Sequence, residues 1–193
     1  MKLASPADLM ARLNVSNSFT GMTSTVESVL DAATAYLETA LSTSLSEQSW
    51  VEVFQANKTL MTNKFWLYQR FVSECTIYGS NTLPNPNDVS NLTLITDSVV
   101  NYDYGFILVA PMYSYYTISY TSGFIEKAIP SWLKEAGIST AVALFKSQSV
   151  PSAKREYSSV GLSTHNFNTV YNLIKDKIIT PYNGTTSIMK VLQ

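Results

Sequence analysis

The spacing of apolar residues changes along the chain, and each change marks a different kind of expected element. Ser5, Pro6 and Asp8 form a helix-capping pattern, which predicts a short helix that continues to Leu13. A second capping box at 24–27 predicts a helix over 25–42. The apolar residues of this second helix follow one stripe with helical spacing: Val26, Val29, Leu30, Ala33, Tyr36, Leu37, Ala40 and Leu41.

From Gln48 the apolar spacing drops to two residues, which is typical of β-strands. The segments expected as strands are Trp50–Phe54, Phe65–Val72, Thr76–Tyr78, Leu92–Thr96, Phe106–Val109 and Tyr115–Tyr120. We expect the last three to belong to an antiparallel sheet, with the turn 101–105 joining the first two of them. The proline- and asparagine-rich stretch 84–88 is expected to be a loop.

The stretch 118–148 organises the rest of the predicted fold. It indicates the end of a strand, a turn at Gly123, and a helix over 131–147 that starts after Pro130. This helix is apolar over most of its circumference, so we expect it to be enclosed by its own subunit or by a neighbouring one. Its small residues would let the 25–42 helix approach closely.

The C-terminal part of the chain indicates an arm. Periodicity is lost from Ser147 to Ser163, and helical spacing returns from His165 to Ile179. The end of the chain, 187–192, is apolar, which is more easily explained if it docks on a partner, for instance by adding a strand to it. The fold class expected is α+β: a small helical bundle packed on an antiparallel β-sheet, with residues 1–149 as the core and 150–193 as the arm.

Composition narrows the classes of function. Charged residues make up 14% of the chain, the net charge is −1 and the pI is about 5.8. A chain of this kind lacks the basic footprint that tight nucleic-acid binding requires. The single cysteine excludes an internal disulfide framework. The first ten residues lack the apolar run of a signal peptide, and the longest apolar run, 106–113, is too short to span a membrane.

The sequence offers little catalytic chemistry. Cys75 and His165 could pair as a nucleophile and its base, but Cys75 is better interpreted as a small core residue and His165 as a helix cap or a solvated side chain. The acidic residues are scattered singly, so we expect no metal site, and the seven glycines form no phosphate loop, so we expect no cofactor. The expectation is therefore a protein that is not an enzyme.

A set of tyrosines leaves an alternative open. Together with the asparagines they could form an exposed platform that stacks on glycans or bases, as in a phage tail or adhesin module. Tyrosines that alternate in a half-buried sheet are the commoner case. The residues concerned are Tyr102, Tyr104, Tyr113, Tyr115, Tyr116 and Tyr120.

Two segments resemble the head–tail connector (adaptor, or head-completion) proteins of tailed bacteriophages. In the first, residues 29–38 match the family's helix pattern (L/I)-x-x-A-x-x-(Y/F)-(I/L)-E. In the second, residues 119–124 stand where the family has x-Y-x-(A/S)-G-(Y/F), and residues 128–136 look like its (V/I)-P-x-x-(L/I)-(K/R)-x-A helix start. Together these segments extend the resemblance over about half of the chain.

The resemblance implies a structural protein of the virion neck, assembled in the host cytoplasm. Such a protein would form a ring, of twelve copies in this family, between the portal and a tail or nozzle protein. It would extend the DNA channel and touch passing DNA without sequence specificity. We expect two sets of contact residues. The portal-docking set is Tyr182, Ile188, Met189, Val191 and Leu192, and the set that packs the subunit and the ring is Trp132, Leu133, Ala136, Ile138, Val142 and Phe145. The loop 84–88 or the turn 101–105 is expected to face the tail or the channel.

Overall fold

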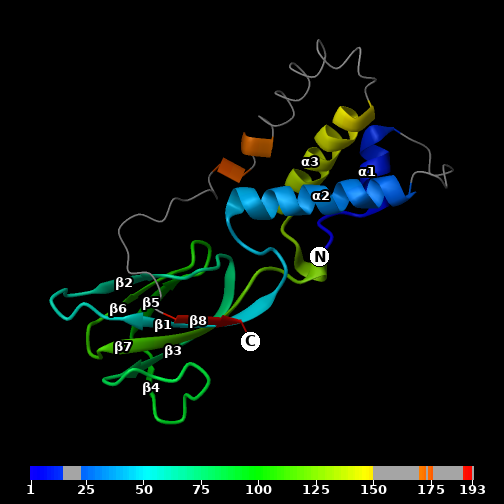
Figure 1. Cartoon of the computed structure of the whole chain (residues 1–193). Coiled ribbons are helices and arrows are strands. Elements are labelled where there is room, and N and C mark those ends of the chain that lie inside the picture. The colour runs from blue at the N-terminus through cyan, green and yellow to red at the C-terminus, as the bar shows by residue number, and fades with distance from the viewer. Residues whose placement is uncertain (15–22, 150–169, 173, 176–188, 193) are drawn as a thin grey trace. The chain divides into compact units, whose positions relative to one another are not determined.

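The computed structural model describes residues 1–14, 23–149, 170–172, 174–175 and 189–192 of the 193-residue chain. The chain divides into two compact units (Figure 1). The helical unit comprises Met1–Ser42 and Ile125–Ile178, and the β-unit comprises Thr43–Phe124 and Ile179–Gln193. The combination of helices and antiparallel strands confirms the expected α+β class.

The first helix, α1, spans Pro6–Leu13 and is capped as predicted. The Ser5 hydroxyl accepts the Asp8 N–H at 3.2 Å, and the Asp8 carboxylate accepts the Ser5 N–H at 3.0 Å. Two N–H groups that the start of a helix leaves without partners are thereby satisfied. The hydrogen bonds from Ser5, and after them the ammonium of Lys134, lower the pKa of Asp8 below its usual value.

The second helix, α2, spans Thr23–Leu41. The predicted capping box is wrong: the helix begins at Thr23, so Ser24 lies inside the first turn. A helix can begin earlier at little cost because its first-turn N–H groups have no intrahelical partners wherever it starts. The predicted stripe is correct except at Tyr36, which is 42% exposed, and Ala40, which is half-buried; the buried members are Val26, Val29, Leu30, Ala33, Leu37 and Leu41.

The third helix, α3, spans Ser131–Ser149 and follows the short 3₁₀ helix η2 at Glu126–Ala128. It packs against α1 and α2, which confirms the predicted helix pairing. The shared core draws on all three helices: Leu9, Val26, Val29, Leu30, Ala33, Ile138 and Ala141. Glycine is needed at position 137 because a Cβ there would lie 2.9 Å from the Leu3 Cβ.

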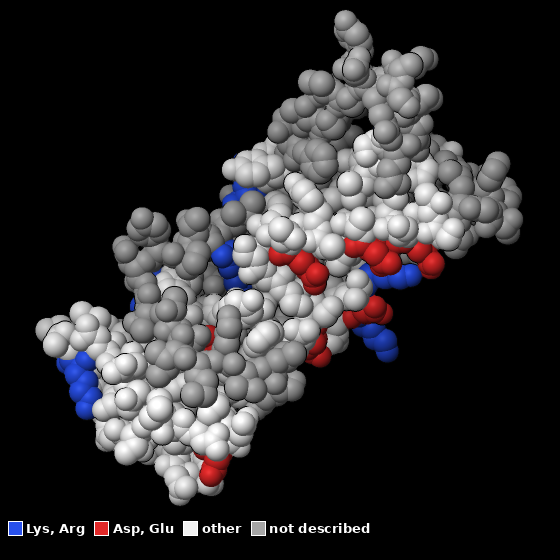
Figure 2. Space-filling view, viewed as in Figure 1, with Lys and Arg blue, Asp and Glu red and all other residues white. Residues whose placement is uncertain are grey.

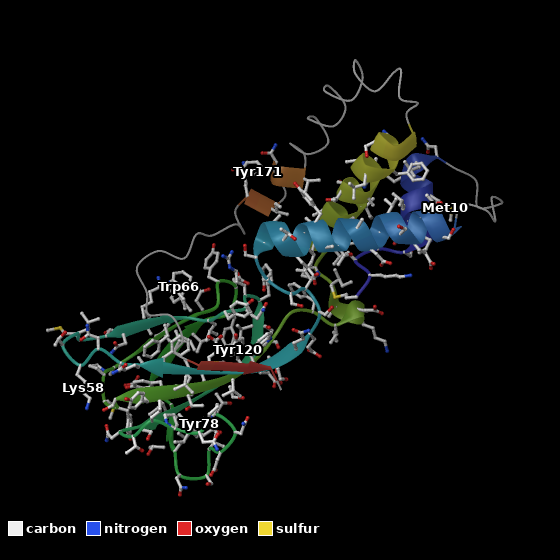
Figure 3. The ribbon with its side chains drawn as sticks, viewed as in Figure 1. Met10, Lys58, Trp66, Tyr78, Tyr120 and Tyr171 are labelled. Atoms are coloured by element: carbon white, nitrogen blue, oxygen red, sulfur yellow. The ribbon has the colours of Figure 1, made fainter. Side chains whose placement is uncertain are left out.

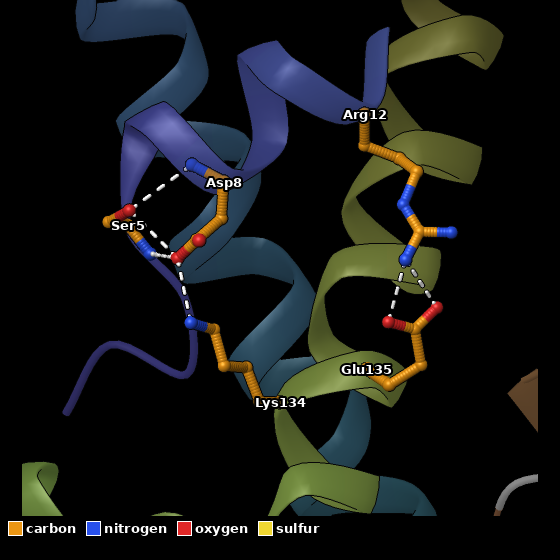
Figure 4. Close-up of polar contacts among 5 residues, drawn as sticks. All are labelled: Ser5, Asp8, Arg12, Lys134 and Glu135. Atoms are coloured by element: carbon orange, nitrogen blue, oxygen red, sulfur yellow. Dashed lines mark hydrogen bonds and ion pairs between the residues drawn. The ribbon is translucent and has the colours of Figure 1, made fainter.

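Two ion pairs fasten α1 to the start of α3 (Figure 4). The Lys134 Nζ lies 3.1 Å from the Asp8 carboxylate, and the Arg12 guanidinium lies 2.7 Å from the carboxylate of Glu135. All four side chains are about a third or more exposed, so each pair contributes little to stability beyond fixing the pairing of the helices.

The β-unit contains two antiparallel sheets. The larger has the strand order β4-β3-β7-β1-β8, and the smaller has the order β2-β6-β5. The strands of the larger sheet are β1 (Gln48–Gln55), β3 (Val72–Ser80), β4 (Thr93–Ile95), β7 (Tyr115–Ser122) and β8 (Met189–Leu192). Those of the smaller sheet are β2 (Asn63–Trp66), β5 (Ser98–Asn101) and β6 (Phe106–Val109).

One hydrophobic core joins the two sheets as a sandwich. Phe54 and Tyr116 of the larger sheet contact Phe65 of the smaller, with ring centroids 4.8 Å and 5.4 Å apart. The remaining buried members of this core are Leu67, Val72, Ile77, Ile107, Val109, Ile118 and Tyr120.

The strand predictions were wrong at two places. The expected strand 65–72 is broken, because β2 ends at Trp66 and Phe71 has a left-handed backbone, with φ of 55°. The strand β5 was missed because it is short and follows the polar residues Thr96 and Asp97. As a result, the turn 101–105 joins β5 to β6, not the 92–96 segment to β6, and the strands form two sheets.

The arm is described only in part. Residues 170–172 and 174 are helical, within the helix expected over 165–179, and Val170 and Ile174 are buried. The helix α3 continues to Ser149, two residues beyond its predicted end. Residues 150–169 and 176–188 lie outside the described part of the chain, so the domain boundary at residue 149 stays a prediction.

Candidate functional site

The described part of the chain contains no catalytic group that stands out. It holds no cluster of three metal-ligating side chains, and it has no helix with the length and hydropathy of a membrane span. Cys75 is half-buried against the sandwich core, and burial raises its pKa to about 12. A thiol with that pKa is protonated at neutral pH and a poor nucleophile. His165 lies outside the described residues.

One carboxylate, that of Glu52, is completely buried in β1 between the two sheets. Its Oε1 accepts hydrogen bonds from the Tyr68 N–H, at 2.7 Å, and from the Tyr120 hydroxyl. Among the described residues, its Oε2 has no hydrogen-bond partner. Burial, and after it the neighbouring Glu52, raise the pKa of Tyr120, so that hydroxyl keeps its proton and acts as a donor.

The Glu52 cluster fastens the segment 67–71 that breaks the predicted strand. The Tyr120 hydroxyl accepts the Gln69 N–H at 3.2 Å, and the Gln69 Oε1 accepts the Thr43 hydroxyl and the Ser44 N–H, each at 2.8 Å. Tyr120 and Gln69 are 2% and 5% exposed. The cluster is closed to solvent, so it stabilises the fold and offers no surface to a substrate.

The sandwich has two ends, and they present different loops. At the first, here called the crossing end, the chain enters the β-unit at Thr43 and leaves it at Phe124. The turn 101–105 lies at this end, because the Tyr102 carbonyl accepts the N–H of Val72, the residue paired with Ser122. At the opposite, loop end are the segments 56–62, 81–92 and 110–114.

Hydrogen bonds hold the three loops of the loop end together. The Ala56 N–H donates to the Ser114 carbonyl at 2.9 Å, and the Asn81 Oδ1 accepts the Ser114 N–H at 3.3 Å. The Tyr116 hydroxyl accepts the N–H groups of Met112 and Tyr113 at 3.0 and 3.2 Å, and it donates to the Ala110 carbonyl. The segments 56–62 and 81–92 are therefore both hydrogen-bonded to the segment 110–114, which lies between them.

The loop end carries exposed apolar side chains. Met61 is 95% exposed, Met112 68%, Leu83 57% and Leu60 47%; together these four residues are called the loop-end patch. Lys58 comes from the same loop as Leu60 and Met61 (Figure 3). Large apolar side chains exposed at one end of a domain are typical of a protein contact site, and methionines adapt easily to a partner's shape. This patch was not predicted; the run Leu60-Met61 between two strands was its only sequence signal.

The two predicted contact sets lie in different places. Of the portal-docking set, Met189, Val191 and Leu192 belong to β8, which pairs with β1 of the same chain, and Tyr182 and Ile188 lie outside the described residues. Of the packing set, Leu133, Ala136 and Ile138 are buried within the subunit. Its other members, Trp132, Val142 and Phe145, are half-buried.

The predicted tyrosine platform does not form from all of its members. Tyr116 and Tyr120 are 1% and 2% exposed and pack in the sandwich core. Tyr102 is 48% exposed at the crossing end, where it cannot share a surface with two core residues. The interpretation of the alternating tyrosines as residues of a half-buried sheet is therefore correct for Tyr116 and Tyr120.

Charge is sparse on the surface. Figure 2 shows small groups of charged side chains on a mostly uncharged face, with acidic residues along α2. Lys2 lies beside these residues, and its contact with Glu27 at 3.1 Å raises the pKa of its ammonium. No continuous basic track is visible on this face.

Comparison with known proteins identifies the fold. No protein-family model matches the sequence, and no curated protein matches it. Among solved structures, a chain in the neck of an empty gene transfer agent (GTA) particle, computed with C6 symmetry, has the same fold. The likeness has a TM-score of 0.52 at 16% identity, over 93% of this chain and 91% of that chain. A chain in the neck of a native GTA particle, computed with C12 symmetry, aligns with a TM-score of 0.49 at 16% identity, over 93% of each chain.

Proposed function

We propose that this chain is a head–tail connector subunit in the neck of a tailed phage or of a phage-like particle, and that it has a structural and not an enzymatic role. The observation that carries the proposal is the fold shared with a neck chain over nine-tenths of both chains. The independent resemblance of residues 29–38 and 119–136 to connector proteins points the same way.

The physical character of the described surface supports this role. DNA must slide through a neck without being held, and a chain of net charge −1 with few basic residues does not grip phosphates. The closed Glu52 cluster and the protonated thiol of Cys75 suit a subunit that transmits load and does no chemistry.

In this proposal the copies form a ring of twelve. A ring of twelve is compatible with the sixfold symmetry used for the neck whose chain has this fold. Neighbouring copies would meet at the half-buried residues Trp132, Val142 and Phe145 of α3, of which the last two also pack against the core of their own subunit. Residues after Thr180, with Tyr182, Ile188, Met189, Val191 and Leu192, would attach the ring to the portal.

The loop-end patch would face the tail or nozzle protein. It is built from loops held together by hydrogen bonds, it is apolar, and the loop 84–88 leaves the sandwich at the same end. The turn 101–105, the other segment considered for this role, lies at the crossing end instead.

Negative-stain images of the purified protein, with and without the portal of the same particle, test the proposal. The expected result is a ring that stacks on the portal. A protein that forms no ring, either alone or on the portal, would refute the proposed function.

Two variants then assign the two faces of the ring. A chain truncated after Thr180, which also lacks the strand β8, is expected to lose portal binding; undiminished binding would refute the role of the C-terminus. Met61→Lys is expected to leave ring and portal binding intact and to block attachment of the tail. Ile125→Lys, at a 48% exposed apolar position in the helical unit, is the matched control.

A further inference from the structure

The larger sheet ends in two different edge strands, β4 and β8. No described strand pairs with the outer edge of either one. An edge strand presents unpaired N–H and C=O groups, which can pair with another chain. Natural proteins usually protect such an edge with lysine, proline or a covering element.

The β4 edge is short, Thr93–Ile95, and it carries neither lysine nor proline. From Thr93 to Asn101 the chain has one charged residue, Asp97, and no proline. Leu94 is 55% exposed in β4, and Val99 is 63% exposed in β5. The edge of the smaller sheet at β2 is different, because the Lys64 Nζ there lies over the rings of Trp66 and Phe106, at 4.3 and 4.1 Å from their centroids. The exposed apolar side chains are therefore a feature of β4 and β5 and not of the β2 edge.

A hollow of about 670 Å³ opens beside the β4 edge. Its walls come from β3, β4, β5 and the residues beside them, and they combine two kinds of side chain. The apolar ones are Cys75, Ile77, Leu94, Ile95, Val99 and Val100, and the others are Thr76, Thr96, Ser98 and Tyr102. A strand that adds to an edge places alternate side chains on one face, where a hollow of this kind can receive them. The β4 edge and the hollow thus have the two parts of a strand-addition site: unpaired backbone and a place for side chains.

We propose that this site receives the β8 edge of a second copy of this chain, so that the larger sheets continue from copy to copy around the ring. The inference rests on the proposed function, since a closed ring needs a head-to-tail contact between two different patches of one subunit. The two edges of one sheet are such a pair. They also differ in charge, because the one charged residue of β8 is Lys190 and the one charged residue beside β4 is Asp97.

The topology predicts the direction of the contact. All neighbours in the larger sheet are antiparallel, so β4 and β8, the first and fifth strands in its order, run in the same direction. If a second copy is rotated about an axis close to the strand direction, its strands still run in the same direction as those of the first copy. The pairing between copies is therefore parallel, whereas a twofold dimer through two β4 edges would be antiparallel.

Cysteine pairs test the contact directly. One tagged chain carries Leu94→Cys, and a second, differently tagged chain carries Met189→Cys or Val191→Cys. Adjacent strands lie about 4.8 Å apart, within the Cα separation that a disulfide spans. We expect oxidation of mixed rings to link the two tags. A link between two Leu94→Cys chains, or none between the tags, overturns the inference. Chains that carry only the native Cys75 measure the background of disulfide formation between the tags.

A charge at the edge provides the second test. Leu94→Lys is expected to shift the protein from ring to monomer in light scattering while its melting temperature stays unchanged. The matched control is Leu83→Lys, at a leucine of nearly equal exposure, 57%, on the loop end, which should leave the ring intact. If Leu94→Lys forms a ring of normal size, the contact between the β4 and β8 edges is refuted but the proposed function is not. If the wild-type protein forms no ring, the proposed function is refuted.

Discussion

The hydroxyl of Tyr120 supports two buried polar groups at once, so its removal tests the Glu52 cluster. In Tyr120→Phe, Glu52 loses one of its two hydrogen bonds, and the Gln69 N–H loses its acceptor. A hydrogen bond to a charged group contributes about 1.5–3 kcal/mol, and an unsatisfied buried N–H costs about 1–3 kcal/mol. Because both groups are closed to solvent, we expect a loss of about 3 kcal/mol in the free energy of unfolding.

Urea unfolding followed by tryptophan fluorescence measures this loss. Trp50 and Trp66 both lie in the β-unit, and Trp50 is close to Tyr68, with ring centroids 5.5 Å apart. The midpoint should fall while the dependence on urea concentration stays the same. In a chain of this size, 3 kcal/mol corresponds to a fall of about 10 °C in melting temperature.

Tyr102→Phe is the matched control, because that tyrosine is 48% exposed and should change stability by less than about 0.5 kcal/mol. Glu52→Gln combined with Tyr120→Phe in a double-mutant cycle isolates the coupling between the two side chains. A loss below about 0.5 kcal/mol in Tyr120→Phe, or a coupling energy near zero, would refute the structural role assigned to the cluster.

Three further predictions concern single residues. Gly123→Ala should cost about 1–3 kcal/mol in urea unfolding, because the φ of 90° is strained for alanine and its Cβ would lie 2.3 Å from the Ser46 carbonyl oxygen; a neutral effect would contradict this geometry. The lowered pKa of Asp8 adds stability that is fully present above its usual value of 3.8 and is lost as the pH falls through the folded pKa. The melting temperature of Asp8→Asn should therefore vary less than that of the wild type as acid is added in this range, and equal slopes would refute the cap. The raised pKa of Cys75 predicts a reaction with a thiol reagent at pH 8 that is about 10³-fold slower in the native than in the urea-unfolded protein; equal rates would show that the thiol is accessible.

Local patterns in the sequence were sufficient for the helical unit. The cap at Ser5 and Asp8 and the buried stripe of α2 depend on neighbours within one or two turns, and they formed as predicted. The small residues of α3 also indicated its close packing with α2. Tyr36 departed from its stripe because exposure depends on what covers a helix face, and helical spacing does not contain that information.

The β-unit was predictable in its strand content but not in its pairing. The spacing of β1, β6 and β7 was clear, yet nothing local shows that the strands separate into two sheets, because pairing partners lie far apart in sequence. The predicted strand 65–72 ends early, at Trp66, and Phe71 has a left-handed backbone. The buried hydrogen bond from the Gln69 N–H to the Tyr120 hydroxyl holds the segment between them in place. Such a bond network exists only after the chain has folded.

Residue types and short-range spacing were enough to predict the class of the fold, the cap of α1, the glycine turn at position 123 and the low charge. Tertiary structure alone decided which surfaces are available for contact. It buried Glu52, placed Met61, Leu83 and Met112 at one end, and left the outer edge of β4 without a described partner strand. Each outcome depends on residues that meet only when distant strands pair.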